Sequence, residues 1–566
     1  MTRRCVPVNR SDFLVTVAGV RTSGIECGLD GYTGAPCARV APSSRRYTLT
    51  SEKGIFMTVD PRTPVIVGVG QAAERIGEPD YRAMSAVAMA AAAAQAALDD
   101  CAAPGAASAV EIAAGIRQFE NSSPYSSAPL GNSTNYPRSV ARRVGAEPAR
   151  AILDVVGGQG PQRLITELAG TIAAGAAEVA LVFGSDATST TRHFAKAEEK
   201  PDFSESVDGQ LEDRGYGLDG LVTRHTAIHG LVDAPTQYAL LENARRARLG
   251  ISPAQYAPRM GELFAPFTRV AAKNPFAASP VERSAGDLIT VTEGNRMIAD
   301  PYPRLLVARD QVNQGAAALL MSVDAARRFG VPEQKWVYLR GHADLTEQGL
   351  LERIEPSHAP SAAMAVREAL AVAGVGLDDI ATFDLYSCFP IAVFNVCDGV
   401  GLAPDDPRGL TLTGGLPYFG GAGNNYSMHG IAETVAAMRS APGRFGLVGA
   451  NGGILSKYSV GVYSTTPGNW AADRSRKLQD EISGWPKTPV TEHPDGLARI
   501  ETYTVRNDGG RRTGVIFGRL ESDGSRFLAN TVDGGDELLA LLTDDDPIGA
   551  RISVRSFDYG NRVALA

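Results

Sequence analysis

One stretch of the chain, Gly414–Gly430, combines a permissive backbone with a cluster of polar groups. Its sequence, GGLPYFGGAGNNYSMHG, holds six glycines in seventeen residues and nearly no charge. Such a backbone can turn sharply and lie close to a ligand. Hydrogen-bonding side chains gather at its end: Asn424, Asn425, Tyr426, Ser427 and His429. A run of this kind is either a tight connection or the floor of an active site.

The elements around this stretch repeat an earlier part of the chain. Over Gly157–Ser185, a glycine-rich loop leads into a helix, a glycine and a buried strand, and the same order recurs over Gly420–Gly453. Alanine-rich helices, within Tyr81–Cys101 and Ser361–Ala373, also occupy matching places. The spacing of roughly 265 residues indicates two duplicated α/β halves. The two glycine-rich loops should then face each other across one pocket.

The segments outside this duplication have a different character. Residues 1–56 show no periodic pattern, and we expect a disordered extension or a start at Met57. Residues about 190–300 are polar and rich in Arg and Glu, which predicts a helical insertion over the site, with Tyr238–Leu249 and Pro253–Leu263 as surface helices. Residues 493–566 contain short alternating runs separated by turns, typical of a small β domain or barrel.

Two local motifs resemble known sites but lack the required context. GVGQAA follows the apolar run Pro64–Gly70 and imitates a dinucleotide fingerprint, yet a polar loop delays the next helix, so we expect a turn from strand to loop. His225 and His229 stand four residues apart, but Thr226 replaces the glutamate of the HExxH zinc motif. We therefore interpret these histidines as part of a surface helix and expect no metal site.

Bulk composition excludes several classes of protein. The 566 residues are 44% hydrophobic and 21% charged, as in ordinary soluble proteins of roughly two to four domains. A net charge of -8 offers no basic field for nucleic acid. No apolar run reaches the length of about 18 residues needed to span a membrane. The six cysteines are sparse and form no CxxC pair, which favours reduced thiols in a cytoplasm.

Several motifs together resemble the thiolase superfamily, over about residues 62–465. QGPQRLITELAGTIAAGAAEVALVFGSDATS resembles the nucleophile helix and the strand after it, and MIADPYPRLLVARDQVNQGAAALLMS resembles the end of the first half. FDLYSCF, GGLPYFGGAG and GANGG follow in the family's order. The branch that fits best is the sterol-carrier-type thiolase-like proteins with an additional C-terminal domain. The resemblance implies a five-layer αβαβα fold, with halves at 62–330 and 331–467 and an OB-like domain at 493–566.

The family's catalytic residues are replaced. Its nucleophilic cysteine falls on Gly158, its catalytic histidine on Gly421, and its second cysteine near Ala450 or Gly449. A Claisen condensation needs a thiolate to accept the acyl group and a base to form the carbanion. Since glycine and alanine supply neither, we expect no ordinary thiolase activity.

Other residues remain as candidates for a thioester site. We expect catalytic groups among Cys388, Tyr386 and His429, although each also fits a structural role, as a buried thiol, a core tyrosine or a helix cap. Backbone amides at the start of a helix can stabilise a thioester oxyanion. The remaining candidates for binding, some of which also suit turns, are Gly158, Gly160, Gly421, Asn424, Asn425 and Asn451.

The resemblance leaves three functions open. The first is an acyltransferase, similar to acetyl-CoA acetyltransferases of lipid metabolism, that uses altered chemistry on acyl-CoA thioesters. The second is an aldol lyase that cleaves a β-hydroxyacyl-CoA with Tyr386 as the proton-transferring group, with the C-terminal domain as a fused counterpart of a separate subunit. The third is a non-catalytic CoA or acyl-CoA binding protein. Each implies coenzyme A as substrate or ligand, no other cofactor, and a monomer or homodimer.

Overall fold

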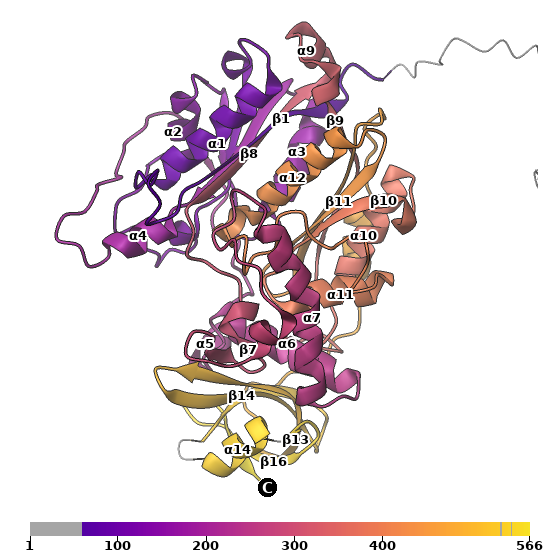
Figure 1. Ribbon diagram of the computed structural model, residues 1–566. Coiled ribbons are helices and arrows are strands. Elements are labelled where there is room, and N and C mark those ends of the chain that lie inside the picture. The colour runs from indigo at the N-terminus through magenta and orange to yellow at the C-terminus, as the bar shows by residue number, and fades with distance from the viewer. Residues whose placement is uncertain (1–58, 533–534, 545) are drawn as a thin grey trace, which may run out of the picture. The chain divides into compact units, whose positions relative to one another are not determined.

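A computed structural model describes residues 59–532, 535–544 and 546–566 (Figure 1). The expected N-terminal extension, residues 1–56, lies outside the described residues, as do Cys5, Cys27 and Cys37. The elements described below belong to one unit of the chain, Met57–Ala566.

Four strands of each half follow the same order, β2-β4-β8-β1 in the first and β10-β11-β12-β9 in the second, which confirms the predicted duplication. In the first half, β3 lies beyond β2. β1 pairs with β9, so both halves join in one ten-stranded sheet, whose far edge is β5. The first-half strands are β1 (Pro64–Ala73), β2 (Ile112–Gly115), β3 (Arg150–Leu153), β4 (Val179–Asp186), β5 (Glu212–Asp213) and β8 (Gln314–Ser322). The second-half strands are β9 (Val337–Thr346), β10 (Ile380–Leu385), β11 (Phe445–Gly452) and β12 (Lys457–Ser464).

Helices cover both halves and also fill the space between them. Helices α3 (Gly160–Ala173) and α12 (Tyr426–Ser440) pack against each other and against strands of both halves, and Figure 1 shows them at the centre. α1 (Ala86–Cys101) and α2 (Tyr136–Arg143) cover the first half, and α10 (Pro360–Ala373) with α11 (Pro390–Val400) covers the second. The result is the expected layered α/β architecture.

Glycines on the first strand of each half let the alanine-rich helices lie close to the sheet. A Cβ atom added at Gly70 would lie 2.1 Å from the carbonyl oxygen of Ala93, and one at Gly341 only 1.9 Å from that of Ala369. These glycines therefore serve helix packing. Our prediction of a turn at GVGQAA is wrong, because β1 continues through this motif to Ala73.

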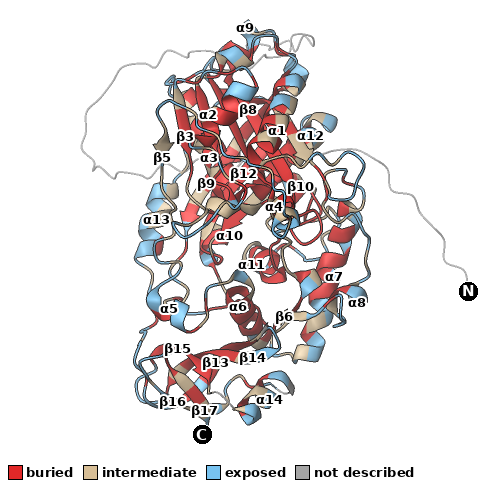
Figure 2. Ribbon diagram, turned by 90° about the vertical axis from the view of Figure 1, so that its left-hand side faces the viewer, coloured by how far each residue is buried: buried red, intermediate tan, exposed pale blue. Residues whose placement is uncertain are grey.

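The insertion contributes a helix to the interior. α6 (Ala234–Arg248) is almost fully buried between α11 and the C-terminal domain, whereas the sequence predicted a surface helix (Figure 2). Its arginines explain the difference, because Arg245 pairs with Asp398 and Arg246 with Asp546. Buried charges are tolerated when they are paired. α7 (Pro253–Ala271) has a buried face and an exposed one.

The C-terminal domain is a small closed barrel, as predicted. β13 pairs with both β14 and β16, and the ring closes through β15 and β17. α14 (Asp536–Asp544) packs on the barrel, and the insertion adds β6 (Met297–Ala299) and β7 (Tyr302–Pro303) to the same sheet. The barrel strands are β13 (Gly496–Asp508), β14 (Arg511–Leu520), β15 (Arg526–Thr531), β16 (Arg551–Arg555) and β17 (Arg562–Leu565).

The two spaced histidines fix the insertion to this barrel. They lie in and just after α5 (Arg224–Ile228), and both side chains are buried, so our prediction of a surface helix is wrong here too. The Nε2 atom of His229 accepts a hydrogen bond from the backbone N–H of Asn561, 2.7 Å away. Burial lowers the pKa of His229 to about 4, so the ring is neutral and can accept this bond.

Candidate functional site

A cavity of about 650 Å³ lies where the two glycine-rich loops meet. The insertion contributes Tyr238 and neighbouring residues of α6 to its wall. The predicted site residues in its lining are Gly158, Tyr386, Cys388, Gly421, Asn424 and Asn451. Most of the exposed surface of the cavity is apolar, which is typical of small-molecule sites.

The two loops are joined directly by hydrogen bonds. The backbone N–H of Gly157 donates to Oδ1 of Asn424 at 3.0 Å, and the hydroxyl of Ser427 donates to the carbonyl of Gly158 at 2.5 Å. The amide nitrogen of Asn424 donates to the carbonyl of Arg117 at 2.8 Å. Asn424 therefore holds the loops together, and its amide group is already engaged within the protein.

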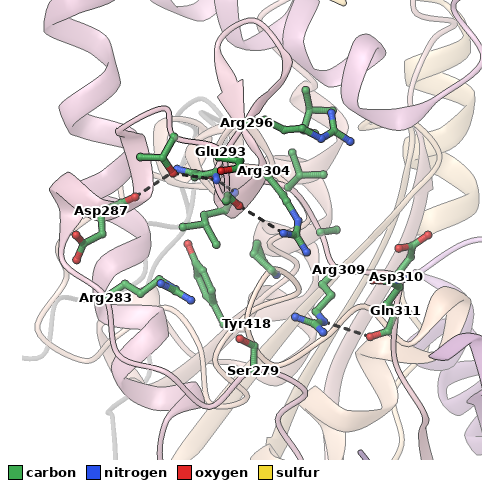
Figure 3. A pocket seen from close by; sticks show the side chains of 18 of the residues that line it. Ser279, Arg283, Asp287, Glu293, Arg296, Arg304, Arg309, Asp310, Gln311 and Tyr418 are labelled. Atoms are coloured by element: carbon green, nitrogen blue, oxygen red, sulfur yellow. Dashed lines mark hydrogen bonds between the residues drawn. The ribbon is translucent and has the colours of Figure 1, made fainter. Parts of the chain in front are cut away.

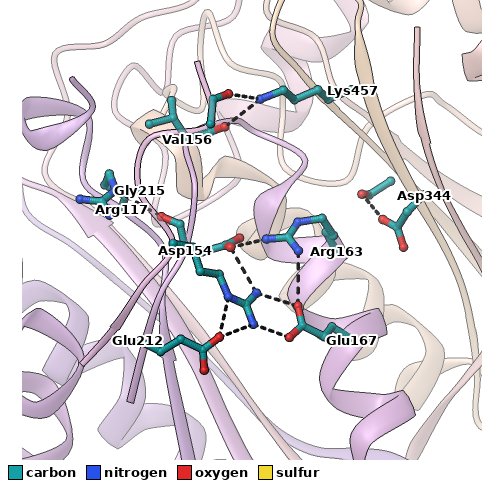
Figure 4. A network of polar contacts seen from close by, with 12 residues as sticks. Arg117, Asp154, Val156, Arg163, Glu167, Glu212, Gly215, Asp344 and Lys457 are labelled. Atoms are coloured by element: carbon teal, nitrogen blue, oxygen red, sulfur yellow. Dashed lines mark hydrogen bonds and ion pairs between the residues drawn. The ribbon is translucent and has the colours of Figure 1, made fainter. Parts of the chain in front are cut away.

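A network of ion pairs supports the loop that precedes α3 (Figure 4). Asp154 is fully buried and pairs with Arg163 and Arg214. Arg214 also pairs with Glu167 at 2.5 Å and with Glu212 at 2.9 Å. Because bidentate arginine pairs fix geometry, the network holds the start of α3 and the Gly157–Gly160 turn in place.

Tyr386 occupies the space that a side chain at position 158 would need. A Cβ atom added at Gly158 would lie 2.3 Å from the Tyr386 hydroxyl oxygen and 2.5 Å from two of its ring carbons. This hydroxyl has no hydrogen-bond partner among the described residues, and the ring packs edge-on against Tyr426. Burial raises the pKa of Tyr386, so its hydroxyl stays protonated at neutral pH and can act as a donor.

Cys388 lies in the same cavity, beside a polar chain. The amide nitrogen of Asn451 donates to the Tyr238 hydroxyl at 2.9 Å, and this hydroxyl donates to the carbonyl of Gly453 at 3.0 Å. Oδ1 of Asn451 has no partner among the described residues. Burial raises the pKa of the Cys388 thiol to about 12, which leaves almost no thiolate at neutral pH.

We predict that Cys388 reacts slowly with iodoacetamide in the folded protein. With its pKa near 12, the thiolate fraction at pH 7.5 is more than about a thousandfold below that of a free cysteine with a pKa of about 8.5. Peptide mass spectrometry at pH 7.5 should find Cys388 unmodified under conditions that alkylate it fully in urea. Rapid labelling of the folded protein at this residue would show an activated thiol instead.

Three of the predicted site residues do not line this cavity: Gly160, Asn425 and His429. His429 lies in the first turns of α12, where its Nδ1 contacts Oε1 of Gln71 at 2.7 Å. Burial lowers the pKa of His429 to about 3. The Asn425 amide nitrogen donates to the carbonyl of Gly184 at 2.7 Å, and Gly160 begins α3. Their functional roles stay predictions.

An arginine-lined pocket, which the sequence did not predict, adjoins the cavity (Figure 3). Its volume is about 880 Å³, and both pockets are lined by residues 307–310. We call it the arginine pocket after Arg283, Arg296, Arg304 and Arg309. None of these four is within ion-pair distance of a carboxylate among the described residues, whereas Arg192 at the same pocket pairs with Asp310.

The electrostatics of the arginine pocket favour an anion. Burial and the neighbouring charge of Arg304 lower the pKa of Arg309, as expected where cations lie close together. The Arg309 Nε–H donates to the carbonyl of Gln311 at 3.2 Å, and Arg304 donates to that of Gly294 at 3.4 Å. Both contacts are to neutral groups, and the lining holds five arginines against the three carboxylates of Asp287, Glu293 and Asp310, so positive charge is in excess. A phosphate or carboxylate would neutralise this excess.

Neither a metal-binding cluster nor a membrane-spanning helix is found in the part of the chain that the structure describes. No group of three or more His, Cys, Asp or Glu side chains there is placed to hold a metal ion. No helix there is both long and apolar enough to cross a membrane.

Comparison with known proteins defines the class. Residues 477–558 match the family model described as the thiolase-like protein type 1 additional C-terminal domain. At the level of fold, the chain is similar to an Ltp2–ChsH2(DUF35) aldolase (20% identity, 71% of this chain and 98% of that one, TM-score 0.50). It is likewise similar to the dimeric peroxisomal thiolase of Saccharomyces cerevisiae (14%, 72% and 98%, TM-score 0.50). No curated protein matches the chain. This is a thiolase fold with an added domain.

A much higher similarity identifies the family. The chain is 56% identical to a monomeric SCP2-thiolase-like protein type 1 from Mycobacterium smegmatis, over 90% of this chain and 100% of that one, with a TM-score of 0.78. The chain therefore belongs to the SCP2-thiolase-like proteins of type 1. This confirms the resemblance drawn from the sequence motifs.

Proposed function

We propose that this protein binds an acyl-CoA thioester and lacks ordinary thiolase chemistry. The observation that carries the proposal is the junction of two pockets: residues 307–310 line both the arginine pocket and the apolar cavity that contains Tyr386. CoA has matching parts, with phosphates at one end and a thioester at the other. One ligand of this kind fits both pockets.

In this proposal each part of the ligand meets complementary groups. The phosphates lie among Arg283, Arg304 and Arg309, whose guanidinium groups suit phosphate oxygens. The thioester reaches the cavity, where the protonated Tyr386 hydroxyl donates to its carbonyl oxygen. Oδ1 of Asn451, which lacks a partner among the described residues, accepts a hydrogen bond from a ligand N–H or O–H.

The same geometry argues against rapid acyl transfer of the acetyl-CoA acetyltransferase type. The Cys388 thiol is protonated at neutral pH, and the space of a nucleophile at position 158 is filled by Tyr386. His429, the remaining candidate base, does not line the cavity. Acyl transfer is thus an activity of the superfamily, whereas binding of an acyl-CoA thioester is the function that this cavity supports best.

Removing positive charge from the arginine pocket tests the proposal. We predict that the double variant Arg283→Gln/Arg304→Gln binds CoA at least about tenfold more weakly, since each charged hydrogen bond contributes about 1.5–3 kcal/mol. Isothermal titration calorimetry measures this directly. Arg328→Gln is the control, because Arg328 pairs with Glu178 on the surface and lines neither pocket. Equal loss in both variants, or no CoA binding by the wild type, would contradict the proposal.

The free hydroxyl of Tyr386 also supports a second candidate, an aldol lyase acting on a β-hydroxyacyl-CoA. A hydroxyl that stays protonated can donate to the developing thioester enolate during carbon–carbon cleavage. Cleavage of such a thioester by the wild type, lost in Tyr386→Phe while CoA affinity persists, would establish this activity. If the wild type binds CoA but does not cleave the β-hydroxyacyl-CoA, the protein is a binding protein, as first proposed.

We also infer a monomer that works in the cytoplasm. β5 pairs with the edge of β3, and Arg150 pairs with Glu212 across them at 2.7 Å, so this edge is occupied within the chain. The three cysteines in the described residues are all free, as in a reducing compartment. Sedimentation velocity should give a single species near 59.5 kDa, and a species of twice this mass would contradict the inference.

A further inference from the structure

A second cavity, of about 690 Å³, lies where the core, the insertion and the C-terminal domain meet. All three parts contribute apolar side chains to its lining. The insertion supplies Leu221 and Leu231, and the C-terminal domain supplies Val490. The core supplies Leu350, Leu351 and Ile454. We call it the domain-junction cavity.

The domain-junction cavity adjoins the cavity that contains Tyr386, which we call the thioester cavity. Leu221 lines both of them. Residues that are adjacent in the sequence also line the two cavities. Val232 and Gly453 line the thioester cavity, whereas Leu231 and Ile454 line the domain-junction cavity. The side chain of Leu221 is half-buried and borders both spaces.

Some polar side chains in this lining are engaged within the protein, whereas Nε2 of His225 and one terminal nitrogen of Arg353 have no partner among the described residues. Nζ of Lys457 donates to the carbonyl of Gly217 at 2.7 Å, and Glu352 accepts from Lys487 at 2.9 Å. The carboxylate of Glu352 is thus paired with a cation, and the ammonium group of Lys457 is held by a neutral carbonyl oxygen. The apolar side chains of the cavity remain for contact with a ligand, and a chain of methylene groups is the ligand part that gains most from them.

The C-terminal domain holds one wall of this cavity in place. Arg526 is fully buried and donates to the carbonyl of Leu351 at 2.8 Å, and to the carbonyls of Arg353 and Ile354. The backbone N–H of Thr488 donates to the carbonyl of Glu352 at 2.8 Å. Segment 351–354 is therefore positioned by the added domain.

We propose that the acyl chain of the bound thioester passes Leu221 into the domain-junction cavity, and that the C-terminal domain serves to build this compartment. The ligand class is a long-chain acyl-CoA. This inference rests on the proposed function, since it assigns the acyl part of the same ligand. It gives the added domain a role in chain-length selection.

Calorimetry with acetyl-CoA, octanoyl-CoA and palmitoyl-CoA, below micelle-forming concentrations, tests the inference. Each methylene buried raises affinity by up to about fourfold, so wild-type protein should bind palmitoyl-CoA at least about tenfold more tightly than acetyl-CoA. Leu350→Trp fills the domain-junction cavity, and because Leu350 does not line the thioester cavity, this change should remove the gain while acetyl-CoA affinity stays within about twofold. Val222→Trp is the matched control, because Val222 is half exposed and lines neither cavity.

The outcomes separate the two proposals. If acetyl-CoA and CoA do not bind to wild-type protein, the proposed function fails. If they bind, but affinity is independent of chain length or Leu350→Trp keeps the full gain, only the acyl-chain compartment fails.

A second readout needs no variant. Palmitoyl-CoA carrying a diazirine at the chain end should, on irradiation, label the peptide that contains Leu350 and Leu351. Labelling confined to other surfaces would overturn the inference.

Discussion

Gly158→Ala should lower the free energy of unfolding by about 1–3 kcal/mol, because the added methyl group overpacks a filled space. The new Cβ would lie 2.3 Å from the Tyr386 hydroxyl oxygen, so the ring has to move. The displaced hydroxyl no longer meets the thioester, and acetyl-CoA affinity should fall about tenfold, the effect of one lost hydrogen bond. Urea denaturation and calorimetry measure the two effects.

A double-mutant cycle assigns this cost to Tyr386. In a Tyr386→Ala background, Gly158→Ala should be nearly neutral, which gives a coupling energy of about 0.5–3 kcal/mol. Gly160→Ala is the control, because its Cβ would have no neighbour nearer than 3.5 Å. It should change stability by no more than about 1 kcal/mol, and in the stabilising direction. Additive effects of the two changes at positions 158 and 386 would contradict the packing seen here.

Arg526→Met should be among the most destabilising substitutions in the chain, at about 3–5 kcal/mol, because it breaks a buried ion pair. Two nitrogens of Arg526 contact the carboxylate of Glu501, both at 2.6 Å. The substitution leaves Arg519 as the remaining cation at this carboxylate and removes the Arg526 donors from the carbonyls of segment 351–354. The midpoint of urea unfolding measures the loss.

Two further variants separate the ion pair from a general effect of lost charge. Arg551→Met removes a surface pair with Glu521 and should cost about 0–1 kcal/mol. Arg526→Lys keeps the charge but loses the forked geometry, so its stability should lie between Arg526→Met and the wild type. Equal stability of Arg526→Met and Arg551→Met would show that the C-terminal domain does not depend on this contact.

The fold was predictable from sequence because its signals are local and repeated. Buried strands, alanine-rich helices and glycine-rich loops recur in the same order in both halves, and the strand order confirms this. The positions that we assign to the family's nucleophile and histidine, Gly158 and Gly421, followed from counting along these elements. Both line the cavity.

Contacts between segments far apart in the sequence were not predictable. Tyr238 lies in the insertion, 150 residues before Cys388, yet both line the cavity. No local sequence pattern indicates that the two residues meet. Arg245 and Arg246 made α6 look exposed, because their partners Asp398 and Asp546 lie in other segments. The arginine pocket was missed for the same reason, since its cations are spread over residues 283–309.

A crystal structure of the protein with acetyl-CoA tests the central claim most directly. We predict the intact thioester in the cavity, with its carbonyl oxygen about 2.7–3.2 Å from the Tyr386 hydroxyl. The phosphates should lie among Arg283, Arg304 and Arg309. An acetyl group bonded to Cys388, or CoA bound outside both pockets, would contradict the account.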